Sequence, residues 1–196
     1  SHDRPRILNV RAGNDGSDIP RDQRARHCLS KEERMVGALR EQLMLRFIFS
    51  VPGMPCVYYG DEAGTEGCAD PFCRRTYPWG HEDQDMLARY KAMTAMRNDH
   101  PVLRTGECAY IAPCADVLGV IRTNENGQDA FGHAAENACA VTLINRSARE
   151  VIVYLTAEDV SGAKTLVTDD GQTLTARSGA FSVKVKGLQG VTGFAK

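Results

Sequence analysis

The sequence lacks an excess of charge of either sign. Its 196 residues include 24 lysines and arginines against 25 aspartates and glutamates, which gives a net charge of −1. Without a field of one sign, binding to nucleic acid or to anionic lipid is not expected. A neutral partner such as a sugar fits this balance better, and the 42% hydrophobic content is ordinary for a globular protein.

Long apolar runs are also missing. No stretch approaches the roughly 18 apolar residues of a membrane span, and the N-terminus has no basic segment followed by an apolar one, as a secretion signal has. We therefore expect a soluble protein with no membrane partner. The seven cysteines are an odd number in a chain too long to need disulfides, which favours reduced thiols and a cytoplasmic location.

The spacing of a metal site is absent as well. Cys68 and Cys73 are five positions apart and lack the C-x-x-C pairing of zinc ligands, so two unrelated thiols are a simpler interpretation than a metal site or a disulfide. Four of the five histidines have no mutual spacing that suggests a metal-binding triad; these four are His27, His81, His100 and His133. We predict neither a metal nor a cofactor.

Composition divides the chain near residues 101–106. All six methionines, the only tryptophan and seven of the eight prolines precede Thr105, and the remainder is rich in Val, Thr, Ala and Gly in short alternating runs. This shift predicts two domains, 1–105 and 106–196.

The first domain reads as helix, strand, helix. Ser30 and Glu33 form a capping box, which predicts the start of an amphipathic helix over about 31–50. The apolar run 56–59 is typical of a parallel strand buried on both faces, and a second helix follows over about 82–99. This order is a piece of an α/β array, and a lone parallel strand needs neighbours that the sequence does not obviously contain.

The second domain reads as all-β. Eight strands are predicted, and they are separated by turn signals such as Asn126-Gly127, Asp170-Gly171 and Ser178-Gly179. Their ranges are about 107–113, 117–124, 138–145, 150–156, 163–168, 171–175, 180–186 and 190–195. They suggest a small antiparallel sandwich, with a polar loop over 125–137.

Three groups of residues, in this order and spacing, carry a family resemblance. They are Ser1-His2-Asp3 with Arg6-Ile7-Leu8; Gly53-Met54-Pro55 with Tyr58-Tyr59-Gly60-Asp61-Glu62; and Asp70-Pro71 with Cys73-Arg74-Arg75 and Pro78-Trp79. Together they resemble the C-terminal part of the α-amylase superfamily, closest to neopullulanase, cyclomaltodextrinase and maltogenic amylase. The resemblance covers 1–105 by motif and 106–196 by position.

The resemblance implies a fold of the α/β plus all-β class. The chain would supply the last quarter of a (β/α)₈ TIM barrel, followed by an antiparallel β-sandwich domain. Residues 1–3 would be the tip of strand seven and 55–60 strand eight, with 31–50 and 82–99 as helices seven and eight. Active sites of such barrels lie at the C-terminal ends of the strands, where both motifs would fall.

The resemblance also implies a site. Asp3 resembles the third carboxylate of the family, which stabilises the transition state, and His2 resembles its neighbour that binds the same sugar. Asp70 and Arg74 resemble a pair that contacts glucose units on the non-reducing side of the cut. The alternatives are a solvated, frayed terminus for His2 and Asp3, and a loop ion pair involving Arg75 for the other two.

Two aromatic residues and two carboxylates near this site are ambiguous. Trp79 and Tyr77 are candidates for stacking on sugar rings, although Trp79 suits packing under the second helix equally well. Asp61 and Glu62 are adjacent, so we interpret them as structural, with Asp61 fixing the loop.

A retaining glycosidase needs a carboxylate nucleophile and a carboxylic acid about 5 Å apart. In the family these belong to strands four and five, and nothing in 1–196 resembles either one. The chain therefore reads as a C-terminal fragment of an enzyme that hydrolyses α-1,4 or α-1,6 bonds of maltodextrin, cyclodextrin or pullulan, and alone it should be inactive. The sequence also departs from the family at Arg4 and Pro5, which puts fine specificity in doubt.

An alternative from another class is a self-standing, non-catalytic β-sandwich module that binds carbohydrate or protein. The second domain has few aromatic residues and no tryptophan, which favours a role in bracing the barrel instead. We also expect homo-oligomers that pair or swap through the region around 56–59 and the helix 31–50, because helices seven and eight would expose the apolar faces that normally cover barrel strands.

Overall fold

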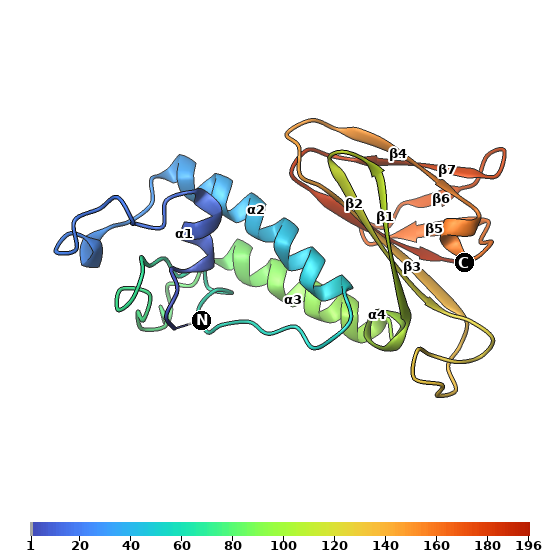
Figure 1. Ribbon diagram of the computed structural model, residues 1–196, viewed down its shortest axis with the longest axis horizontal. Coiled ribbons are helices and arrows are strands. Elements are labelled where there is room, and N and C mark those ends of the chain that lie inside the picture. The colour runs from blue at the N-terminus through green and yellow to red at the C-terminus, as the bar shows by residue number, and fades with distance from the viewer. Residues whose placement is uncertain (1) are drawn as a thin grey trace. The chain divides into compact units, whose positions relative to one another are not determined.

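The computed structural model describes residues 2–196, so Ser1, the first residue of the histidine–aspartate motif, lies outside the described residues. The described chain divides into two compact units (Figure 1). The first runs as far as Gln42 and resumes over Cys56–Ala92, and the second comprises Leu43–Pro55 and Met93–Lys196. Residues from both parts of the sequence therefore enter the second unit.

The α-helices occur within the first 105 residues. They are α1 (Ile7–Ala12), α2 (Lys31–Ser50), α3 (Gln84–Asp99) and α4 (Val102–Thr105). Helices α2 and α3 confirm the two predicted helices, and the capping box is present. The backbone N–H of Ser30 donates to Glu33 Oε2 at 2.7 Å, and the N–H of Glu33 donates to Ser30 Oγ at 3.1 Å. Among residues 2–196, no helix combines the length and the apolar character needed to cross a membrane.

The predicted strand over 56–59 is wrong. Between α2 and α3 the chain forms turns and irregular backbone, with no strand. Cys56 is exposed and so in large part are Val57 and Tyr59, so burial on both faces is also absent. A parallel strand exists only when a neighbouring strand accepts and donates its ladder hydrogen bonds. In the described residues every strand lies beyond residue 106 and pairs with another strand of that region, so none is left to pair with 56–59.

In the first unit, a buried carboxyl on α2 meets a tyrosine on α3. Tyr90 Oη donates to Glu41 Oε1 at 2.7 Å, and Glu41 is fully buried. Burial raises the pKa of Glu41 to about 7, and the nearby charge of Asp61 adds to this, while the Tyr90 hydrogen bond acts in the opposite direction. Burial also raises the pKa of Tyr90, so the phenol stays protonated and donates.

Eight antiparallel strands of the second unit lie within the described residues, and they confirm the eight predicted strands. They are β1 (Glu107–Cys114), β2 (Val117–Asn124), β3 (Ala138–Asn145), β4 (Val151–Thr156), β5 (Thr165–Thr168), β6 (Thr173–Thr175), β7 (Ala180–Val185) and β8 (Gly190–Ala195). A six-stranded sheet has the order β1-β2-β3-β8-β5-β6, and β4 pairs with β7 in a separate two-stranded sheet.

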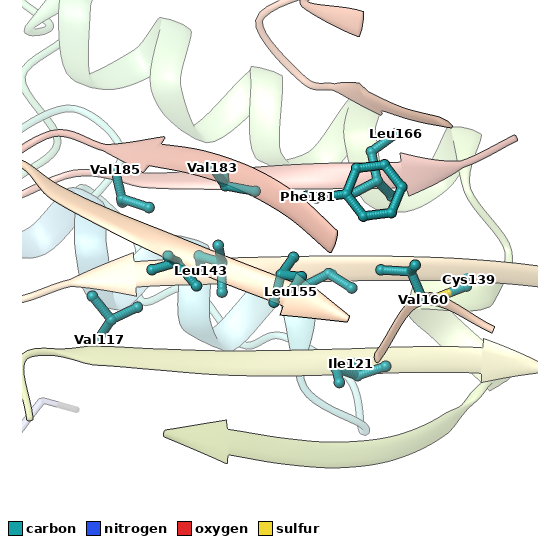
Figure 2. Packing of buried hydrophobic residues seen from close by; sticks show 12 residues of the cluster. Val117, Ile121, Cys139, Leu143, Leu155, Val160, Leu166, Phe181, Val183 and Val185 are labelled. Carbon is teal, nitrogen blue, oxygen red and sulfur yellow. The ribbon is translucent and has the colours of Figure 1, made fainter. Parts of the chain in front are cut away.

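The two sheets share one hydrophobic core (Figure 2). In β4, Val153 and Leu155 are buried whereas Ile152 and Tyr154, which alternate with them, are exposed, as the two-residue period of a strand dictates. Phe181 of β7 lies in the same cluster, which includes residues of β2, β3 and β5 from the larger sheet. Alternation along each strand therefore sets which face enters the core.

Three buried arginines connect separate segments within the second unit. Arg46 of α2 pairs with Asp169 at 2.8 Å and donates to Thr192 Oγ1 at 2.9 Å. Arg97 of α3 donates to the carbonyl oxygen of Phe49 at 2.7 Å, just before α2 ends.

Arg122 of β2 is buried and has no carboxylate partner among residues 2–196. Its guanidinium donates to the carbonyl oxygens of Ser50, Leu103 and Gly106 at 2.7–2.9 Å. Burial lowers its pKa, and the carbonyl dipoles take the place of a counter-ion. One side chain thereby fixes the end of α2, helix α4 and the approach to β1.

Candidate active site

Arg6 lies at the centre of the candidate site, although only 1% of its side chain is exposed. Its Nε donates to the carbonyl oxygen of Cys73 at 2.7 Å, and its Nη1 donates to that of Tyr59. The backbone N–H of Arg6 donates to the carbonyl oxygen of Gly67 at 2.9 Å. The segment before α1 is thus joined to two loops more than 50 residues away.

The loop at 58–61 surrounds the charge of Arg6. The guanidinium lies over the rings of Tyr58 and Tyr59, 4.5 and 4.6 Å from their centroids, and 3.3 Å separates its Nη1 from Asp61 Oδ1. Burial raises the pKa of Asp61 to about 6 despite this ion pair, because desolvation outweighs the attraction to Arg6. This ion pair is what the structural role predicted for Asp61 requires, and the role itself stays a prediction.

The loop that carries Asp70 and Arg74 is anchored by a residue of helix α1. The buried Asn9 accepts a hydrogen bond from the N–H of Gly67 at 2.7 Å through Oδ1. A Cβ at Gly67 would lie 2.6 Å from the carbonyl oxygen of Phe72, so the close approach of the backbone at these two positions requires glycine. Sequence reasoning assigned no role to Arg6 or Asn9, because burial of a single polar residue leaves no periodic signal.

The structure brings all four predicted site residues together. Arg74 Nη2 lies 3.0 Å from Asp3 Oδ1 and 2.7 Å from Asp70 Oδ1, and His2 Nε2 lies 3.1 Å from Asp3 Oδ1. Arg74 Nε also donates to the carbonyl oxygen of His2 at 3.1 Å. All four side chains are roughly half exposed, so the cluster is accessible from solvent.

These contacts bear on the two structural alternatives, a frayed terminus for His2 and Asp3 and a loop ion pair involving Arg75. Residues 2 and 3 are anchored by Arg74 and by Cys73, whose thiol donates to the carbonyl oxygen of His2 at 2.9 Å. Arg75 is not part of the predicted loop ion pair; it donates to the carbonyl oxygens of Ala25 and His27. Two carboxylates, a guanidinium and an imidazole at one exposed point offer the donors and acceptors that bind sugar hydroxyls.

The aromatic pair predicted near the site is present. Trp79 is 80% exposed, so the alternative that it packs in the core is wrong. The ring of Tyr77 lies against it, with 4.5 Å between centroids. Contact with sugar stays a prediction for both rings. Within residues 2–196, no group of three or more His, Cys, Asp or Glu side chains is arranged to hold a metal ion.

No protein-family model matches the chain. Sequence comparison finds amylopullulanase from Thermoanaerobacter thermohydrosulfuricus, 34% identical over 191 residues, which are 97% of this chain and 12% of that protein. The maltogenic α-amylase of Bacillus acidopullulyticus is 27% identical over 193 residues, which are 93% of this chain and 28% of that enzyme. The chain thus spans only 12% and 28% of the length of these two relatives.

Structure comparison finds the same group of proteins. The crystal structure of an α-amylase from Anoxybacillus superposes with a TM-score of 0.76 at 20% identity. The match covers 99% of this chain and 36% of that one. At this identity the likeness establishes a shared fold.

Proposed function

Because this chain belongs to the α-amylase superfamily of glycoside hydrolases, we propose that it forms the C-terminal portion of an enzyme that hydrolyses α-glucans. Its matched relatives are named amylopullulanase, maltogenic α-amylase and cyclomaltodextrinase. The substrate class proposed for the whole enzyme is accordingly a maltodextrin, a cyclodextrin or pullulan, cut at α-1,4 or α-1,6 bonds.

The observation that carries the proposal is the cluster around Arg74. One guanidinium contacts Asp3 and Asp70, and His2 contacts the same oxygen of Asp3 as the guanidinium does. In this proposal Asp3 is the third carboxylate, which stabilises positive charge on the sugar ring in the transition state. His2 binds the same sugar, and Asp70 and Arg74 bind the neighbouring glucose units.

In this proposal, the residues upstream of this chain supply the other catalytic groups that the chemistry requires. A retaining enzyme cleaves the bond with a nucleophilic carboxylate while a carboxylic acid protonates the leaving oxygen. Asp3 assists only a transition state that those two groups generate, so the 196-residue chain alone is proposed to be inactive. Asp61 and Glu62 do not replace them, because Asp61 is paired with the buried Arg6.

The proposed architecture is the end of a TIM barrel over 1–105 and a β-sandwich over 106–196. Two features support it. The irregular segment 54–59 exposes apolar side chains, Met54 by 93% and Tyr59 by 44%, which the rest of a barrel would cover. The predicted apolar face of α2 is incompletely buried too, at Val36, Leu39 and Phe47. The sandwich would brace the barrel.

Asp3→Asn tests the proposed role in the same chain extended upstream to a complete barrel. The change removes the negative charge and keeps the shape, so we expect kcat on a maltooligosaccharide to fall by at least about a hundredfold, with KM little changed. Asp18→Asn is the matched control, because Asp18 lies in an exposed loop and should leave kcat unaltered. Equal activity of the two variants would remove Asp3 from the mechanism.

A further inference from the structure

The loop between β2 and β3 contains the one Asn-Gly pair of the sequence, Asn126-Gly127. The pair was predicted to form a turn, and a tight turn is present between the two strands (Figure 1). The N–H of Gln128 donates to the carbonyl oxygen of Glu125 at 3.0 Å. The backbone φ is 55° at Asn126 and 73° at Gly127, as a type I′ turn requires at both central residues. Both residues are exposed.

An asparagine that precedes a glycine has a nucleophile next to its own side chain. Once a solvent base has removed the N–H proton, the glycine nitrogen attacks the asparagine Cγ, and the missing Cβ of glycine leaves this approach open. The new C–N bond closes a succinimide ring, and the side-chain nitrogen takes up a proton and leaves as ammonia. Water then opens the ring at either carbonyl, which gives aspartate or isoaspartate. This reaction is one reason why asparagine is counted among the thermolabile residues.

The fold restrains the nitrogen of Gly127 through Asn137. The N–H of Gly127 donates to Asn137 Oδ1 at 2.8 Å, and the carbonyl oxygen of Gly127 accepts from the N–H of Ala135 at 2.9 Å. A base reaches the Gly127 proton only after the contact with Asn137 has opened. Because Gly127 and Asn137 are exposed, this opening involves no buried surface and occurs by local fluctuation of the loop.

We propose that Asn126 is a deamidation site and that Asn137 controls the rate of the reaction. Exposure of the turn gives water and base access to it, and glycine at 127 leaves the attacking nitrogen unhindered. The hydrogen bond to Asn137 makes deamidation slow in the folded chain without preventing it.

The other asparagines are held more firmly, and each precedes a larger residue. Three of them are buried, namely Asn9, Asn124 and Asn145. Asn14 Nδ2 donates to Glu33 Oε1 at 2.8 Å. Asn98 lies in helix α3, whose regular backbone fixes the next nitrogen. These positions are internal controls within the same chain.

Deamidation would change both the charge and the backbone of the turn. The new carboxylate lies next to Glu125, which already accepts a hydrogen bond from Ser161 Oγ at 3.0 Å. Isoaspartate also inserts a methylene into the main chain. The turn between Glu125 and Gln128 then has an extra atom to accommodate, so we expect its hydrogen bond to be lost.

The test is incubation of the folded 196-residue chain at mildly alkaline pH, followed by peptide mass spectrometry with separation of aspartate and isoaspartate. We expect both products to accumulate faster at Asn126 than at any other asparagine. The rate should rise with pH, because a base must remove the proton of Gly127. Asn126→Gln should abolish the products at this position, since glutamine cannot close the same ring.

Two variants at 137 test the restraint. Asn137→Ala removes the acceptor and should speed the reaction about fivefold, which is the factor that one neutral hydrogen bond is worth. Asn137→Asp keeps an oxygen acceptor and should react at nearly the wild-type rate. In urea, wild type and Asn137→Ala should react equally fast, because the turn is absent from both.

Either of two results would overturn the proposal. One is product spread evenly over the asparagines of the folded chain. The other is an equal rate for folded wild type and folded Asn137→Ala. Neither measurement involves glucan hydrolysis, so the outcome is independent of the proposed function.

Discussion

Arg6 places one buried positive charge against two tyrosine rings, a carboxylate and two backbone carbonyls. The family motif draws attention to His2 and Asp3, which are exposed and chemically versatile. Their position, however, depends on a loop that is fixed from beneath by Arg6 and Asn9. Candidate ligand-binding residues can be recognised from sequence by their chemistry, whereas the residues that orient them have no such signature.

Replacing Arg6 with lysine should therefore destabilise the chain. A single ammonium cannot reach all three groups, which are the carbonyl oxygens of Tyr59 and Cys73 and the carboxylate of Asp61. We therefore expect the free energy of unfolding in urea to fall by about 2–4 kcal/mol. Arg4→Lys is the control, because Arg4 is exposed. Equal unfolding curves for the two variants would show that the fork of hydrogen bonds around Arg6 contributes nothing.

The elements show where sequence patterns suffice. The capping box and the alternation of β4 are local signals. The predicted helices and all eight strands of the β-domain are present because the turns and neighbouring strands that each element needs lie within the same stretch of sequence. The run 56–59 fails for the opposite reason, since a parallel strand depends on strands elsewhere. Helix α1 was missed because six residues are too few to show a period.

Helices α2 and α3 also hold a pH-sensitive contact in the first unit. The pKa of Glu41 is raised from 4.5 to about 7 in the folded chain, so between these values the folded state binds the proton more tightly. The stabilisation is complete below about pH 4.5 and is lost as the pH rises through 7, up to about 3 kcal/mol in total.

Glu41→Gln should remove this dependence. The wild type is expected to lose more stability than the variant between pH 5 and pH 8, and at pH 8 the variant should be the more stable protein. Chemical unfolding at the two pH values gives the comparison. Parallel losses in wild type and variant would show that Glu41 is ionised in the folded chain at pH 5 as well.

At the scale of the whole molecule, the exposed apolar side chains around 54–59 predict association. Met54, Val57 and Tyr59 lie close together in sequence and are exposed, and such surfaces are normally covered. We expect the mass measured by light scattering to rise with concentration, and Met54→Lys with Val57→Lys to suppress the rise. A mass that stays at one chain at high concentration would count against association.

The central claim is that residues 1–105 complete an active site whose nucleophile and acid lie upstream. Its most direct test is hydrolysis of a chromogenic maltoside and of β-cyclodextrin by this chain, measured beside the same chain extended upstream to a full barrel. Turnover by the extended protein alone is the predicted result. Turnover by the 196-residue chain would place the catalytic carboxylates within it and contradict the structural assignment of Asp61 and Glu62.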